Sequence, residues 1–147
     1  MRIFLATIEH LDALSVLFNE YRVFYQQASD LNAAKLFLKK RFDNCDSVIF
    51  VASEDEQIIG FTQLYPSFSS VSLKRVWILN DLFVAVPYRR KGVARSLIMV
   101  AKQYAQETEA IRIILATQQA NRAAQALYKS LGYEKDEVFA HYSLRLQ

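Results

Sequence analysis

The chain has 147 residues, of which 52% are hydrophobic and 22% are charged, and its formal net charge is +3. A chain of this length buries roughly 70% of its unfolded surface, enough for one core, so we expect a single domain over residues 1–147. The single cysteine, Cys45, excludes an intrachain disulfide and a cysteine metal cluster. With no apolar run near the ~18 residues of a membrane span, these features predict a cytoplasmic protein without a membrane partner.

The first half of the sequence predicts one strand, two helices and a hairpin. We expect a strand over 2–7, followed by helices over 9–24 and 31–42, because their apolar residues recur at spacings of three and four. Runs rich in Val, Ile and Phe at 47–53 and 57–65 flank a short acidic turn and predict an antiparallel hairpin.

The second half continues with alternating strands and helices, after a loop at 67–70. The expected elements are a long strand over 71–86, a helix over 90–108, a buried strand over 111–116, a helix over 120–131 closed by Gly132, and a final strand over 139–146. The predicted order is therefore βααβββαβαβ, a mixed α/β domain in which helices cover a central sheet.

A basic loop between the long strand and the following helix indicates an anion site. The strand ends at Pro87, a loop containing Gly92 follows, and a helix then begins. The free backbone N–H groups and positive partial charge of a helix N-terminus suit a phosphate or pyrophosphate, and glycine allows close approach. The cations cluster here rather than over a surface, which favours a small polyanionic ligand over a nucleic acid.

Two motifs in this half resemble those of the GNAT N-acetyltransferase superfamily. Arg89, Gly92 and Ala94 form the pattern Arg-x-x-Gly-x-Ala after a hydrophobic strand, which resembles the superfamily's acetyl-CoA loop. The second cofactor motif, N-x-x-A-x-x-x-Y-x-x-x-G-F, is matched at Asn121, Ala124, Tyr128, Gly132 and Tyr133, with Tyr for the usual Phe. The order of elements matches too, so the resemblance covers nearly the whole chain. The phrase Asp81-Leu-Phe-Val is loosely similar to the diamine and thialysine acetyltransferase branch.

The resemblance implies an N-acetyltransferase that uses acetyl-CoA as co-substrate and needs no metal. Backbone groups of the strand end would pair with the pantetheine arm as an added strand does, loop and helix N–H groups would hold the pyrophosphate, and Tyr128 would protonate the leaving thiolate. The implied cofactor-binding residues are Leu82, Phe83, Val84, Arg89, Arg90, Lys91, Gly92, Val93, Ala94, Arg95, Asn121 and Ala124.

The acceptor side is less completely specified. A lysine-like amine has a pKa near ~10.4, so making it neutral at pH 7 costs about 4–5 kcal/mol, and a base or a water chain to a base is needed. In the diamine-type relatives a glutamate precedes the Asp-x-Phe-Val phrase, where this chain has Asn80. Neighbours on a strand point to opposite faces, so we expect Asn80 to line the site, Asp81 to be structural and the proton to leave through water. Tyr21, Arg22 and Tyr25 are candidates for substrate contact.

The preferred interpretation is acetyl transfer to a small-molecule amine. Alternative acceptors are a protein lysine or N-terminus and an antibiotic amine, and a non-catalytic domain that senses acetyl-CoA is a further alternative. A Rossmann dinucleotide site is disfavoured, because the loop has one glycine where G-x-G-x-x-G requires three. The resemblance also implies a homodimer through the C-terminal strands.

Overall fold

The structure of this chain is a computed structural model that describes residues 1–147. It divides into two compact units, Met1–Leu115 and Ala116–Gln147. The larger unit contains every strand and three of the α-helices, whereas the smaller contains only α4 (Arg122–Ser130). That the chain folds as a single domain remains a prediction.

The larger unit is a mixed sheet in which strand order follows chain order, β1-β2-β3-β4-β5. All neighbouring strands are antiparallel except β4 and β5, which are parallel. Its elements are β1 (Arg2–Leu5), α1 (Leu11–Phe24), α2 (Leu31–Asn44), β2 (Val48–Glu54), β3 (Gln57–Ser69), β4 (Lys74–Val84), α3 (Val93–Glu107) and β5 (Arg112–Ile114). The predicted α/β class and the order of elements as far as α4 are confirmed. The β3–β4 hairpin extends to Ser69 on its first strand, where a loop was expected.

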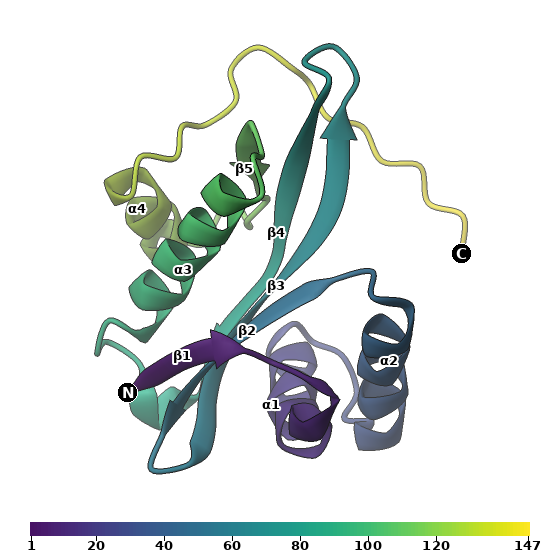
Figure 1. The fold of residues 1–147 in the computed structure, drawn as a ribbon, viewed down its shortest axis with the longest axis vertical. Helices are drawn as coiled ribbons and strands as arrows, with labels where there is room; N and C mark the ends of the chain where they lie inside the picture. Colours follow the sequence, from purple (N-terminus) through teal and green to yellow (C-terminus); the bar gives the residue numbers. More distant parts are fainter. The chain divides into compact units, whose positions relative to one another are not determined.

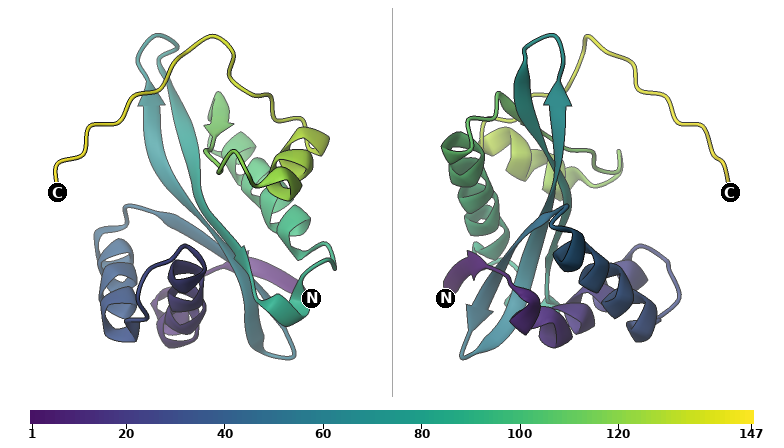
Figure 2. Two further views of the ribbon diagram at one scale, coloured as in Figure 1. Left: turned by 180° about the vertical axis from the view of Figure 1, so that it is seen from behind. Right: turned by 45° about the vertical axis from the view of Figure 1, so that its right-hand side comes forward.

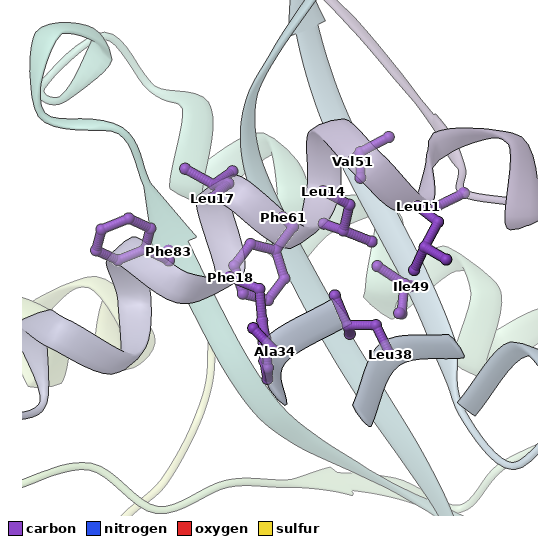
Figure 3. Close-up of a cluster of buried hydrophobic side chains, with 11 residues drawn as sticks. Leu11, Leu14, Leu17, Phe18, Ala34, Leu38, Ile49, Val51, Phe61 and Phe83 are labelled. Atoms are coloured by element: carbon purple, nitrogen blue, oxygen red, sulfur yellow. The ribbon is translucent and has the colours of Figure 1, made fainter. Parts of the chain in front are cut away.

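Helices cover both faces of this sheet, with α1 and α2 on one face and α3 on the other (Figures 1 and 2). Side chains alternate along a strand, and β2 shows the result. Ile49 and Val51 belong to the cluster formed with α1 and α2 that Figure 3 draws, whereas the ring of Phe50 lies 5.5 Å from that of Tyr104 on α3. Burial on both faces explains why β2 is apolar at nearly every position.

Gly60 on β3 allows α3 to lie close to the sheet. A Cβ atom added there would lie 3.1 Å from the Phe83 carbonyl oxygen and 3.2 Å from a methyl carbon of Val93, the first residue of α3. The absence of a side chain therefore sets the distance between the sheet and the start of α3.

In the smaller unit, α4 has a polar cap at its start and a glycine at its end. The Asn121 side chain accepts a hydrogen bond from the Ala124 N–H (3.1 Å), as an N-cap residue does. Gly132 has φ +90°, and the N–H groups of Gly132 and Tyr133 donate to the carbonyls of Lys129 and Tyr128. This pair of bonds is a Schellman motif and confirms the predicted glycine cap.

The predicted final strand over 139–146 is wrong, because no regular structure forms after α4. The Asp136 side chain accepts hydrogen bonds from the N–H groups of Val138 (2.9 Å) and Phe139 (3.0 Å). These donors are therefore used locally and not in the hydrogen-bond ladder of a sheet. Apolar side chains beyond this point, such as those of Tyr142 and Leu146, are exposed. The alternating pattern has no partner strand within this unit.

Candidate active site

A β-bulge at Asn80 shapes the centre of β4. Gln63 of β3 lies opposite Asp81, whereas the next residue, Leu64, lies opposite Leu79. Asn80 is therefore an extra residue on β4, which twists the strand and re-aims its side chains.

The bulge reverses the alternation of β4. Before it, the Trp77 ring lies 5.4 Å from Tyr104 of α3. After it, the Phe83 ring lies 5.7 Å from Tyr21 of α1, on the opposite face of the sheet. Two odd-numbered residues of a regular strand would share a face. The expectation that Asn80 and Asp81 point to opposite faces is therefore wrong: both line one pocket, and the Asn80 amide donates to Asp81 Oδ1 (3.2 Å).

Asp81 is buried, with 6% of its surface exposed, and its carboxylate is surrounded by donors. Gln63 Nε2 donates to Oδ2 (2.8 Å), Asn80 Nδ2 donates to Oδ1, and the Tyr21 hydroxyl also hydrogen-bonds this side chain. A buried carboxylate is tolerated where such bonds compensate its desolvation. The network fixes Asp81 in place at the wall of the pocket.

The pocket beside Asp81 has a volume of about 480 Å³ and is formed by α1, the segment after it, α2, β3 and β4. Its lining is largely aromatic, and Asp81 is its only carboxylate. The aromatic residues that line it are Phe18, Tyr21, Tyr25, Phe37 and Tyr65. Concave sites of this size with few polar groups are typical of small-molecule binding. Tyr25, predicted from the sequence, lies here together with Asn80 and Asp81.

Two tyrosines of the pocket are held in their protonated form. Burial, and then the charge of Asp81, raises the pKa of Tyr65 to about 12. Burial and then Asp81 also raise the pKa of Tyr21 above its ordinary value. Both phenols are therefore hydrogen-bond donors at neutral pH and neither can act as a general base there.

The predicted anion loop lies between β4 and α3 and begins with a 3-10 turn, η2 (Val86–Tyr88). Gly92 is the N-cap of α3 with φ +80°, a conformation that favours glycine, and an added Cβ would meet nothing within 4 Å. No side chain caps this helix end and its first turn contains no acid. Exposed Arg90, Lys91 and Arg95 lie around it. Unpaired N–H groups among cations fit a pyrophosphate.

Arg89 differs from the other cations of the loop because it points back to the sheet. Its Nε donates to the Val84 carbonyl (2.9 Å), and its guanidinium lies over the rings of Phe24 (5.4 Å) and Phe83 (5.2 Å). These contacts give Arg89 a structural role in joining the loop to β4 and α1. A role in binding the cofactor remains a prediction.

The end of β4 has a free edge. β4 pairs with β5 only through Val76, Trp77 and Ile78, so Leu82, Phe83 and Val84 have a neighbouring strand on the β3 side alone. An extended pantetheine arm could pair with this edge as an added strand does. The Val84 carbonyl already accepts a hydrogen bond from Arg89. The backbone N–H and carbonyl of Leu82 and the N–H of Val84 are therefore the groups best suited to pair with the pantetheine arm.

The second predicted motif lies in the smaller unit. Asn121 is the N-cap of α4, and Ala124 and Tyr128 lie within the helix. The Tyr128 ring lies 5.6 Å from that of Tyr133. The roles predicted for Asn121 and Tyr128 in acetyl transfer remain predictions.

Residues 11–133 match the acetyltransferase (GNAT) family. The chain belongs to the GNAT family of acetyltransferases. It is 52% identical over 134 residues to the uncharacterized N-acetyltransferase YhfO of Bacillus subtilis, covering 91% of this chain and 90% of that protein. A probable acetyltransferase of Haemophilus influenzae is 34% identical over 115 residues, covering 78% and 79% of the two chains. A crystal structure of a probable acetyltransferase superposes with a TM-score of 0.96 at 49% identity, covering 100% of this chain and 99% of that one.

These relatives confirm the prediction of an acyltransferase enzyme of the GNAT type. The fold is shared with an aminoglycoside N-acetyltransferase solved in complex with CoA, at a TM-score of 0.81 and 21% identity over 99% of this chain and 95% of that one. The free edge of β4 and the uncapped start of α3 are consistent with acetyl-CoA as co-substrate. No group of three or more His, Cys, Asp or Glu side chains is placed to hold a metal ion, and no helix is long and apolar enough to cross a membrane.

Gln63 and Tyr65 were not predicted as site residues. Both lie on β3, and both contribute to the surroundings of Asp81. The sequence contained one signal, since Gln63 and its neighbour Thr62 are polar residues within a largely apolar run and both are fully buried. A buried polar side chain of this kind requires a partner, which Nε2 of Gln63 has in Asp81, whereas its Oε1 has no hydrogen-bond partner.

Proposed function

We propose that this GNAT acetyltransferase transfers the acetyl group of acetyl-CoA to the amine of a small molecule bound in the pocket beside Asp81. The observation that carries the proposal is the shape and lining of that pocket. It has a concave volume of about 480 Å³, aromatic walls and a single carboxylate. Aromatic rings and a carboxylate together attract a cation such as an ammonium group.

The proposed reaction is a direct transfer. The bound ammonium first loses a proton through water, and the neutral nitrogen then attacks the thioester carbonyl carbon. A C–N bond forms, the C–S bond breaks, and its electron pair leaves on the CoA sulfur. The nitrogen loses a second proton, and the thiolate gains one from Tyr128, the acid that the family motif predicts. A backbone N–H of the free β4 edge would stabilise the charge that develops on the thioester oxygen.

Asp81 has an electrostatic role in this proposal. Its carboxylate is buried and occupied by donors from Gln63 and Asn80, which suits it to attract an ammonium and to hold the pocket in shape. Asn80 is exposed, so water beside it would carry the proton of the ammonium away.

The test is calorimetric titration of the protein with acetyl-CoA, using substitutions at the start of α3. Gly92→Glu and Gly92→Gln share the strain imposed by φ +80°, so the difference between them measures repulsion of the pyrophosphate. We expect Gly92→Glu to bind at least tenfold more weakly than Gly92→Gln. Gln106→Glu, near the other end of the same helix, is the control for net charge and is expected to bind normally. Equal binding by both Gly92 variants would contradict the assigned loop.

Thiol release from acetyl-CoA in the presence of small amines tests the acceptor class. We expect the CoA thiol to be released in the presence of small amines. Release with peptides but with no small amine would contradict the proposal and favour a protein acceptor.

We also infer that two copies of the chain associate through residues 138–146. The exposed apolar side chains of this segment are those of Val138, Phe139, Tyr142, Leu144 and Leu146. Sedimentation equilibrium of the full chain is expected to give a dimer, and a chain truncated after Asp136 a monomer.

A further inference from the structure

Arg22 has an unsatisfied charged donor at the wall of the acceptor pocket. It lies in the last turn of α1 and lines the pocket together with Asp81. Its Nη1 atom is buried and has no hydrogen-bond partner, and Arg22 is not a member of any of the ion pairs. Buried charged donors are almost always paired in folded proteins. Arg22 as a whole is half-buried and lines the pocket, so the part of this guanidinium that faces the pocket is available to a ligand, in which its partner is to be sought.

The pocket thus offers charges of both signs to a small ligand. Asp81 provides a fixed carboxylate, held by Gln63 and Asn80, and Arg22 provides a guanidinium donor. A guanidinium is planar and matches the geometry of a carboxylate, which it binds with two parallel hydrogen bonds. An amine alone would leave Arg22 unpaired and would place a second cation in the same pocket.

The remaining lining indicates the body of the ligand. Apolar ring surface in the same pocket is provided by Phe18, Tyr21, Tyr25, Phe37 and Tyr65. The Tyr21 ring packs edge-on against Tyr25, with centroids 5.1 Å apart, so the two rings form one continuous aromatic wall. Such a surface favours an apolar or aromatic substituent.

We propose that the acceptor is an α-amino acid with an apolar or aromatic side chain, whose carboxylate is bound by Arg22 while its amine lies on the Asp81 side of the pocket. This inference rests on the proposed acetyl transfer to a small-molecule amine and specifies its substrate class. Arg22 acts in substrate binding, and the reaction at the amine is the one given above.

The experiment compares amino acids with amines that differ only in the carboxylate. Thiol release from acetyl-CoA is measured for phenylalanine, leucine and methionine, and for phenethylamine, isoamylamine and 3-methylthiopropylamine, which lack the carboxylate. Both enantiomers of each amino acid are included. We expect at least one amino acid to have a kcat/KM about ten- to hundredfold above that of its matched amine, as loss of a charged hydrogen-bond partner implies.

The Arg22→Gln variant provides the second comparison. It is expected to lose the preference for the amino acid, because its KM for the amino acid rises while its KM for the matched amine falls once the second cation has left the pocket. Acetyl-CoA should bind as it does to the wild type. Arg22→Lys should restore part of the preference. Arg112→Gln, which removes an exposed arginine from β5, is the matched control and should behave as the wild type.

Thermal unfolding separates binding from folding. Because Nη1 has no partner in the protein, Arg22→Gln should unfold at the same temperature as the wild type or higher. A marked decrease would show that Arg22 is structural and would overturn the inference.

The other outcomes also distinguish the two proposals. If amines with and without a carboxylate react equally, the inference is overturned while acetyl transfer to small amines stands. If none of the compounds reacts although acetyl-CoA binds, the amino-acid inference fails together with the small-molecule proposal. If acetyl-CoA itself fails to bind, the assignment of the loop between β4 and α3 as the cofactor site is wrong.

Discussion

Substitution of Gly60 by alanine tests how closely α3 is held against the sheet. The new methyl carbon would lie 3.1 Å from the Phe83 carbonyl oxygen, 3.2 Å from Val93 Cγ1 and 3.4 Å from Leu97 Cδ1. The side chains can move by a few tenths of an ångström. The carbonyl belongs to β4, which is paired with β3, so it cannot yield easily.

The expected cost follows from two opposing effects. Overpacking a well-packed interior costs about 1–3 kcal/mol, whereas replacing glycine by alanine stabilises by about 0.4–1 kcal/mol through the unfolded chain. The contact with a backbone atom favours the upper part of the first range, so the net loss should be about 1–2 kcal/mol. For a chain of this size that lowers Tm by about 2–8 °C. Because Val93 begins α3, affinity for acetyl-CoA should fall too.

The assays are thermal unfolding by circular dichroism and calorimetric titration with acetyl-CoA. Gly92 offers a matched comparison, because an added Cβ there meets nothing within 4 Å and the cost of substitution comes from φ +80° instead. Asparagine tolerates positive φ better than alanine. Gly92→Asn should therefore be more stable than Gly92→Ala, whereas Gly60→Asn should be less stable than Gly60→Ala. An unchanged Tm and affinity for Gly60→Ala would refute the reasoning.

Four further substitutions test the pocket and the loop. Asp81→Asn should raise KM for the amine about tenfold and leave kcat within about threefold, since the carboxylate attracts the ammonium and does not take its proton; a collapse of kcat in a folded variant would identify Asp81 as the base. The raised pKa of Tyr65, about 12, means that the unfolded chain loses this proton first as pH rises, so stability should fall between about pH 10 and 12. Urea unfolding of Tyr65→Phe should show a shallower fall over that window, and an identical slope would contradict the shift. Arg89→Ala should lose about 1–2 kcal/mol of stability in urea unfolding through its bond to Val84 and its ring contacts, whereas Arg90→Ala should keep its stability and bind acetyl-CoA less tightly at low salt; equal effects would contradict the distinction between them.

The periodic features of the sequence predicted most of the fold. The helices α1, α2 and α3 and the strands of the hairpin were found because their apolar residues mark a buried face, as at Leu14 and Leu38, which are fully buried. The glycine cap at Gly132 was found because its turn has a specific backbone requirement. Features with a local cause could therefore be predicted.

Features set by pairing between distant segments could not be predicted in this way. The bulge at Asn80 depends on the register of β4 against β3, which a single strand does not encode. The segment 139–146 alternates like a strand but has no partner to pair with, and the side chain of Asp136 binds its first N–H groups. Arg89 appeared to be one of several equivalent loop cations until its contacts with Phe24 and Phe83 were seen.

The bulge at Asn80 works as a phase shift in the strand. Residues on its two sides follow opposite parity rules, and the extra residue is what allows Asp81 to lie opposite Gln63 and Phe83 opposite Phe61. Deletion of Asn80 would make the pairing of β4 regular and would leave Asp81 and Phe83 facing α1, whereas a strand that kept Asn80 but paired without the bulge would turn both toward α3. In a relative with a gap at this position, the acceptor pocket would therefore keep its carboxylate and lose the amide that donates to it.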